Sequence, residues 1–294
     1  MFGLNIILTK KLNEMKRTKF TTKFLSMLVV LGLTFTGCSD NESTDPEVEQ
    51  QDISEMRLAS EIDEASSAMS DIAIDVYEKQ EQSELGRMNP DFGLPECVTI
   101  TVVLEQNFRE VTIDFGEEGC LVNGNILKGA IILSWERNQE VQQVFISKSL
   151  EDFYFNNKNI LGSKTILKQL SNENGNPQFT HELDLTVIWP NGAQASREGT
   201  KIREWVEGFG SGVFSDNVFE ITGNWTSTFV NGNTHTYEVM TPLRREVICY
   251  YFVSGTVDVQ RTNFGGTFDY GDGNCDNAAT FTFNNGQTIE IVLN

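Results

Sequence analysis

The densest group of potential metal ligands in this chain lies near its C-terminus, at residues 269–276. Asp269, Asp272, Asn274 and Asp276 supply carboxylate and amide oxygens, and the glycines between them allow the backbone to wrap tightly. Oxygen ligands of this kind suit a calcium ion, although the loop lacks the closing bidentate glutamate of an EF-hand. The alternative is a turn in which the acidic side chains cap backbone amides. The sequence is compatible with both the calcium site and the capped turn.

The most basic stretch of the body, residues 197–205, is a second candidate site. Alternation along a strand places Lys201, Arg203 and Trp205 on one face. Cationic and aromatic groups on an exposed strand can stack on sugars or pair with anions. Salt bridges to acidic residues on neighbouring strands are the alternative.

Catalytic signatures of the serine hydrolase, P-loop and dinucleotide-binding classes are absent. His181 and His235 are isolated in their segments and no Cys-x-x-Cys occurs, which disfavours zinc. No stretch singles out a carboxylate pair for glycoside hydrolysis. Four tryptophans would suit either a glycan-binding face or an ordinary β core: Trp135, Trp189, Trp205 and Trp225.

Four cysteines in the body of the chain form a repeated pattern. One pair flanks a segment that contains Thr-Ile-Asp-Phe-Gly, and the other flanks a segment that contains Thr-Phe-Asp-Tyr-Gly. The even number favours disulfides over metal binding. We therefore predict a duplicated unit with local bridges Cys97–Cys120 and Cys249–Cys275, each worth about 3 kcal/mol in the chain-entropy description.

These candidate residues lie on segments that the sequence predicts to be strands. From Cys97 onward, apolar residues recur with period two, as in 183–189 and 289–293. Asn-Gly pairs punctuate the runs, and Asn-Gly favours the type I′ turn of a β-hairpin. About twelve to fourteen strands are expected. The predicted fold is mainly β: a large, curved antiparallel meander or a sandwich.

One helix precedes the strands. Residues from Ile53 to Tyr77 carry apolar side chains at spacings of three and four, with acidic residues between them, and Gly86 and Pro90 end the pattern. We predict an amphipathic helix that packs on its own sheet, on a partner helix, or on no stable surface. The predicted division is a signal peptide at 1–37, a flexible acidic tether at 38–52, the helix segment at 53–90 and the antiparallel β domain at 91–294.

The N-terminal leader determines where we expect the protein to be. Six basic residues precede a short apolar segment that ends in Thr36-Gly37-Cys38 and is too short to span a bilayer. This ending resembles the lipobox of bacterial lipoproteins, in which the cysteine is lipidated. The following Ser39-Asp40-Asn41-Glu42 resembles the surface-export signal of lipoproteins from Bacteroidota, particularly the flavobacterial type.

The charge balance limits the kinds of partner that the protein can bind. The chain has 22 basic and 42 acidic residues, and residues 1–37 hold six basic residues and one acidic residue, so residues 38–294 carry a formal net charge of −25. A body this acidic repels nucleic acid and anionic lipid headgroups. We expect no nucleic-acid partner, and membrane contact through an acyl anchor alone.

Several features together resemble uncharacterised surface lipoproteins of Bacteroidota: the Cys38 leader, Asp114-Phe115-Gly116 with Cys120, Thr241-Pro242-Leu243 before Cys249, and 269–273 with Cys275. The resemblance implies lipidation at Cys38 and a place on the outer membrane, at the cell surface, and it brings no known activity. We expect a non-enzymatic binding or structural component with a protein or glycan ligand. The alternative is a glycan-acting enzyme or a calcium-stabilised glycan-binding module.

Replacing Cys38 tests the anchor. Cys38→Ala is expected to leave the precursor uncleaved at this site and without lipid, because the thiol that would carry the acyl group is gone. Labelling with radioactive palmitate and gel mobility measure both effects, and Ser39→Ala serves as the control that keeps the label. Normal maturation of Cys38→Ala would contradict the assignment.

Overall fold

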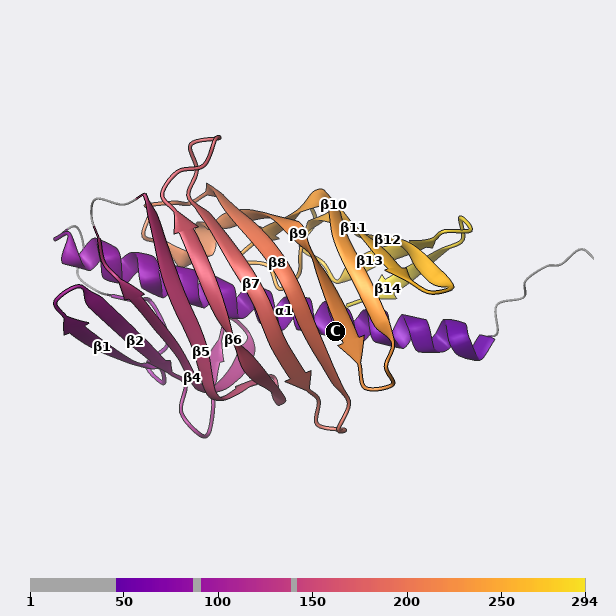
Figure 1. Cartoon of the computed structure of the whole chain (residues 1–294), viewed down its shortest axis with the longest axis horizontal. Helices are drawn as coiled ribbons and strands as arrows, with labels where there is room; N and C mark the ends of the chain where they lie inside the picture. The colour runs from indigo at the N-terminus through magenta and orange to yellow at the C-terminus, as the bar shows by residue number, and fades with distance from the viewer. Residues whose placement is uncertain (1–45, 87–90, 139–141, 294) are drawn as a thin grey trace, which may run out of the picture. The chain divides into compact units, whose positions relative to one another are not determined.

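The computed structural model describes residues 46–86, 91–138 and 142–293, with side chains from Ile53 onward. Helix α1 (Pro46–Glu84) is followed by a 14-stranded antiparallel sheet (Figure 1), so the predicted mainly β fold is confirmed. The strands are β1 (Thr99–Glu105), β2 (Phe108–Asp114), β3 (Cys120–Val122), β4 (Asn125–Glu136), β5 (Gln143–Phe155), β6 (Lys158–Gln169), β7 (Gln178–Ile188), β8 (Gln194–Glu207), β9 (Val218–Phe229), β10 (Thr234–Glu246), β11 (Ser254–Arg261), β12 (Phe264–Asp272), β13 (Ala278–Phe283) and β14 (Thr288–Val292). A short 3-10 helix, η1 (Phe214–Asp216), lies between β8 and β9.

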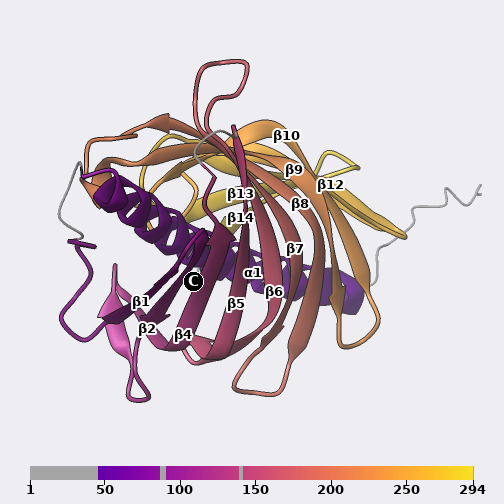
Figure 2. The same cartoon turned by 60° about the vertical axis from the view of Figure 1, so that its left-hand side comes forward.

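The sheet is a single meander rather than a sandwich. Each strand pairs with the next along the chain, except that β3 pairs only with β4, so β4 pairs with β2. The sheet stays open, with β1 and β14 as its end strands. Figure 2 shows that it curves around α1, which runs across its concave side.

Helix α1 begins earlier than the sequence suggested. It starts at Pro46, so residues 46–52, which we assigned to a flexible tether, are helical. Proline favours the first helical position because its fixed φ suits a helix and its missing N–H would have no partner there. The predicted stop is confirmed at Gly86, which has a φ of 68° and donates its N–H to Ser83 O at 2.9 Å.

The helix is buried much more completely than an amphipathic surface helix. Every residue from Met69 to Gln80 is buried, including Asp71, Asp75 and Glu78. Packing on its own sheet is thereby confirmed, and the expectation of an ordinary two-faced helix is corrected. No helix in the described ranges has the length and hydrophobicity needed to cross a bilayer.

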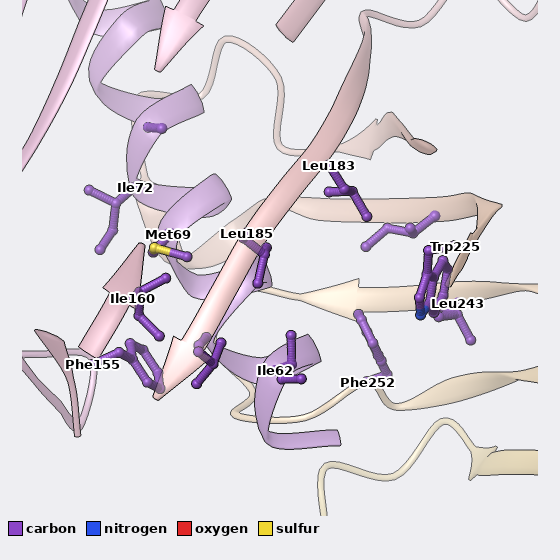
Figure 3. Packing of buried hydrophobic residues seen from close by; sticks show 14 of the residues in the cluster. Ile62, Met69, Ile72, Phe155, Ile160, Leu183, Leu185, Trp225, Leu243 and Phe252 are labelled. Carbon is purple, nitrogen blue, oxygen red and sulfur yellow. The ribbon is translucent and has the colours of Figure 1, made fainter. Parts of the chain in front are cut away.

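Apolar side chains from the helix and the inner face of the sheet form one core. Figure 3 shows Ile62, Met69 and Ile72 of α1 in the same cluster as Phe155 and Ile160. The residues of β7 that alternation predicted to share the apolar face do face the core, since Leu183, Leu185 and Val187 are buried. Alternation along β7 therefore identified the inner face of this strand correctly.

Both predicted disulfides are present, Cys97–Cys120 and Cys249–Cys275. The first encloses hairpin β1–β2 and the second encloses hairpin β11–β12. The same contact recurs near the end of the second strand of each hairpin: Asp114 accepts the N–H of Gly116 at 2.8 Å, and Asp269 accepts the N–H of Gly271 at 2.9 Å. The sequence repeat therefore corresponds to a repeated local structure.

The Asn-Gly turns are hairpin turns, but most are not of the predicted type. Only Asn123-Gly124 has positive φ at both residues, 46° and 77°, as type I′ requires. In the pairs at 174–175, 191–192, 231–232 and 285–286 the glycine alone has positive φ. In all four, the glycine N–H also bonds to the carbonyl three residues earlier. These features are typical of a three-residue loop, a type I turn followed by a left-handed glycine.

The curved sheet and the helix are further enclosed by contact between two distant segments. The β3–β4 turn packs against the loop after β10, because a Cβ added to Gly124 would lie 2.4 Å from Tyr250 Oη. A cavity of about 280 Å³ lies beneath this contact, with Ala68 and Ile72 of α1 in its wall. The two disulfide-bearing parts of the chain therefore meet beside the helix.

Gly129 provides a test of the β4–β5 bulge. Its φ is 73°, and a Cβ there would lie 2.2 Å from Asp152 O, so Gly129→Ala should lower the free energy of unfolding by about 3 kcal/mol or more. Gly192→Ala is the matched control, because Gly192 has a φ of 84° with open space around it and should cost about 1 kcal/mol. Urea unfolding of both variants measures the difference, and equal losses would contradict the close approach.

Candidate functional site

The basic stretch of β8 lies inside the molecule. Lys201, Arg203 and Trp205 are 5%, 2% and 4% exposed, on the inner face of the sheet. Neither expectation for them holds, because they face no solvent and do not pair with acidic residues of neighbouring strands. Lys201 and Arg203 instead pair with carboxylates of α1.

Asp63 is the first of two buried carboxylates that each hold two cations. It pairs with Arg197 and, at 2.5 Å, with Lys201 Nζ. Burial by itself raises the pKa of Asp63, but the charges of Arg197 and Lys201 and their hydrogen bonds outweigh it, so the pKa lies below its ordinary value. The Lys201 ammonium also lies 4.1 Å from the centre of the Trp225 ring.

Asp71, two helical turns further along α1, is the second buried carboxylate that pairs with two cations. It pairs with Arg203 and, at 2.9 Å, with Arg245. Arg245 also donates to the carbonyl oxygens of Cys249 at 2.6 Å and Tyr250 at 2.8 Å. One guanidinium therefore joins the helix to the loop that carries the second disulfide.

Ion pairs continue toward both ends of the helix. Glu55 bonds to His235 Nε2 at 2.7 Å and accepts hydrogen bonds from Asn231 and Asn233. Burial raises the pKa of Glu55, but these hydrogen bonds dominate and lower it to about 2. A depressed carboxyl pKa stabilises the fold above the unfolded value of about 4.5, and that contribution is lost as the pH falls toward about 2.

At the other end, Glu78 pairs with Lys168, and Glu81 and Glu84 both pair with Arg137. Glu84 also pairs with Arg109 at 2.8 Å. In all, ten of the thirteen ion pairs between described residues join α1 to the β domain.

This network was missed from the sequence, although two signals pointed to it. Residues 46–84 contain twelve acidic residues and only two basic ones. Basic residues occupy the inward positions of several strands, as Arg197, Lys201 and Arg203 do on β8. Matching an acidic helix to inward cations would have suggested that the two pack together.

The candidate calcium loop forms a set of capped turns. Asp269 accepts the N–H of Gly271, Asp272 accepts from Asn274 Nδ2, and Asp276 accepts the N–H of Ala278. Within the described ranges, no three His, Cys, Asp or Glu side chains come together to hold a metal ion. The hydrogen bonds match the turn interpretation, and the calcium interpretation stays a prediction.

The four tryptophans belong to the core, each 7% exposed or less. Two of them bond to the helix: Trp135 Nε1 donates to Glu81 at 2.8 Å and Trp189 Nε1 donates to Glu61 at 2.7 Å. A shared glycan-binding face made of the four rings is therefore excluded, although Trp135 borders a cleft.

That cleft, of about 380 Å³, lies at the C-terminal end of α1. Tyr77, Trp135 and Phe209 contribute aromatic rings to its wall, and Gln82 and Arg137 contribute hydrogen-bonding groups. Phe209 is 51% exposed and contacts Trp205 edge-on, with ring centres 5.0 Å apart. The cleft combines apolar surface with a few polar groups, which is typical of small-ligand sites.

Cys38, the predicted lipidation residue, lies outside the described residues. Comparison with known proteins gives no match for this chain among family descriptions, curated proteins or solved structures.

Asp71→Asn tests the importance of the buried pairs. The change leaves Arg203 and Arg245 without their carboxylate in the interior, so the free energy of unfolding should fall by about 3–5 kcal/mol. Urea unfolding measures the loss. Glu207→Gln is the control, because the Glu207 side chain is 59% exposed in its pair with Arg244 and should cost about 1 kcal/mol or less. A small loss for Asp71→Asn would contradict a structural role of the network.

Proposed function

We propose that this chain is a lipid-anchored lipoprotein of the outer membrane, exposed at the cell surface, and that its body binds a glycan without turning it over. The leader ending in Cys38 and the following Ser39-Asp40-Asn41-Glu42 support the anchor and its location. The acidic body supports membrane attachment through the acyl group rather than through the protein surface.

The observation that carries the binding proposal is the cleft at the end of α1. Its wall offers the exposed ring of Phe209 together with Gln82 and Arg137. A sugar has an apolar ring face and a hydroxyl edge, so it can contact an aromatic ring and hydrogen-bonding groups together. The ion pairs between α1 and the strands fix the wall in place, which lowers the cost of ordering a binding site.

The ion pairs in the cleft support binding over hydrolysis. Its two carboxylates, Glu78 and Glu81, are already engaged by Lys168 and Arg137, and Glu81 also accepts from Trp135. A glycosidase needs one carboxyl group free to donate a proton and another free to act as nucleophile or base.

A glycan array with soluble protein comprising residues 39–294 tests the proposal. Phe209→Ala should weaken binding to any hit about five- to tenfold, because the exposed ring of the cleft is lost. Phe145→Ala is the control, since Phe145 is 66% exposed and lies outside the cleft wall.

Three results would contradict the proposal: an array without hits, unchanged binding by Phe209→Ala, or an equal loss in Phe145→Ala. Turnover assays on each hit complete the test, because product released from a bound glycan would overturn the non-enzymatic assignment.

A further inference from the structure

A group of buried basic side chains on the inner face of β5, β6 and β7 has no carboxylate partner among the described residues. Lys148 and His181 are each 1% exposed, and neither Lys148 Nζ nor either ring nitrogen of His181 has a hydrogen-bond partner there. Lys164 is 6% exposed, and its Nζ donates to Ser66 Oγ at 2.9 Å.

The strand register brings these side chains together. Lys148 on β5 is directly opposite Lys164 on β6, and His181 on β7 is directly opposite Ile166 on β6, two residues along the strand from Lys164. Side chains directly opposite each other in a sheet have Cβ atoms about 5 Å apart, and like charges in that position repel. Burial and the neighbouring charge of Lys164 both hold the pKa of His181 well below its ordinary value.

The helix does not supply enough negative charge for this region. Asp63 is shared by Arg197 and Lys201, and Asp71 is shared by Arg203 and Arg245. The next carboxylate along the helix, Asp75, pairs with Lys79 of α1 itself. Glu64, the acidic residue between Asp63 and Asp71, is only partly buried and lies near Lys158 and Arg245. Four Lys and Arg side chains therefore share the carboxylates of Asp63 and Asp71, and Lys148 and Lys164 pair with neither.

The helix presents small hydroxyl side chains to this part of the sheet. Ser66, Ser67 and Ser70 are buried, and Ser66 is the residue that Lys164 contacts. A hydroxyl can hydrogen-bond an ammonium or an anion but cannot neutralise either charge.

An uncompensated buried ammonium is costly, so the group either loses its proton or acquires a counterion. Burial, followed by the charge of Arg203, lowers the pKa of Lys148 to about 7. Below that pH, protonation of the Lys148 amine and binding of an anion favour each other. The anion neutralises the buried ammonium charge, and the ammonium charge attracts the anion.

We propose that Lys148, Lys164 and His181 form an internal binding site for a small monovalent anion of the size of chloride, enclosed between β5–β7 and the serine-bearing turns of α1. The site is independent of the cleft at the end of the helix. The anion supplies the negative charge that Asp63 and Asp71 leave missing.

Thermal unfolding of the full chain in detergent at about pH 6, below the pKa of Lys148, tests the site. Sodium chloride and sodium gluconate are compared at equal ionic strength, since gluconate is too large for an enclosed site. We expect Tm to be about 4 °C higher or more at saturating chloride, with a saturable dependence on concentration. Equal Tm values in the two salts would overturn the proposal.

Lys148→Met should abolish the chloride-specific rise and raise Tm in gluconate, because it removes the unpartnered ammonium. Lys128→Met is the control: Lys128 on β4 lies opposite Tyr154, outside the cluster, and should keep the rise. A chloride-specific rise that survives in Lys148→Met would overturn the proposal. Crystals grown in bromide give an independent measurement, with an anomalous peak expected beside Lys148 and Lys164 Nζ; the absence of that peak would also overturn it.

Discussion

The pairing of an acidic helix with the basic inner face of a curved sheet is the interaction on which the rest of this structure depends. Eight Lys and Arg side chains of the β domain form ion pairs with carboxylates of α1, most of them shielded from water. Replacing both partners of one such pair with apolar groups can leave a fold equally stable, but removing one partner leaves a buried charge. The helix and the sheet therefore hold each other in place. Separating them would expose apolar area and leave buried charges without partners.

The disulfide-bearing hairpins complete this enclosure. The sheet has two end strands and is not closed by hydrogen bonds. Contact between the β3–β4 turn and Tyr250 brings its distant parts together, and Arg245 joins the loop that holds Cys249 to Asp71 of the helix. Each disulfide encloses one hairpin, so the bridges restrict the segments that border the helix rather than crossing the core. Covalent and ionic constraints thus act on the same region.

Because basic residues of the sheet face its interior, the outer face of the sheet is acidic. Glu204 is directly opposite Glu220, and Glu238 is directly opposite Asp258. Like charges in such positions repel, and exposure to water and salt weakens the repulsion. Asn174 and Asn176 donate hydrogen bonds to Glu204, which stabilises its charge locally. The net charge of −25 on residues 38–294 therefore describes the outside of the body better than its interior, where cations gather.

The sequence by itself determined the elements of this fold. Period-two alternation gave the strands and their inner face, glycine after asparagine marked the hairpins, and the repeated cysteine pattern gave both disulfides, because each of these depends on neighbours close in the chain. Only the tertiary structure decided what the inner face meets. In an alternating pattern an inward lysine such as Lys201 looks the same as an outward one, and spacing along a helix cannot tell whether Asp63 faces water or a guanidinium. The cleft likewise joins Tyr77, Trp135 and Phe209 from distant segments, so it exists only once the sheet has curved around the helix. Charge pairing and cleft formation depend on which residues meet across the fold, and no local pattern encodes that.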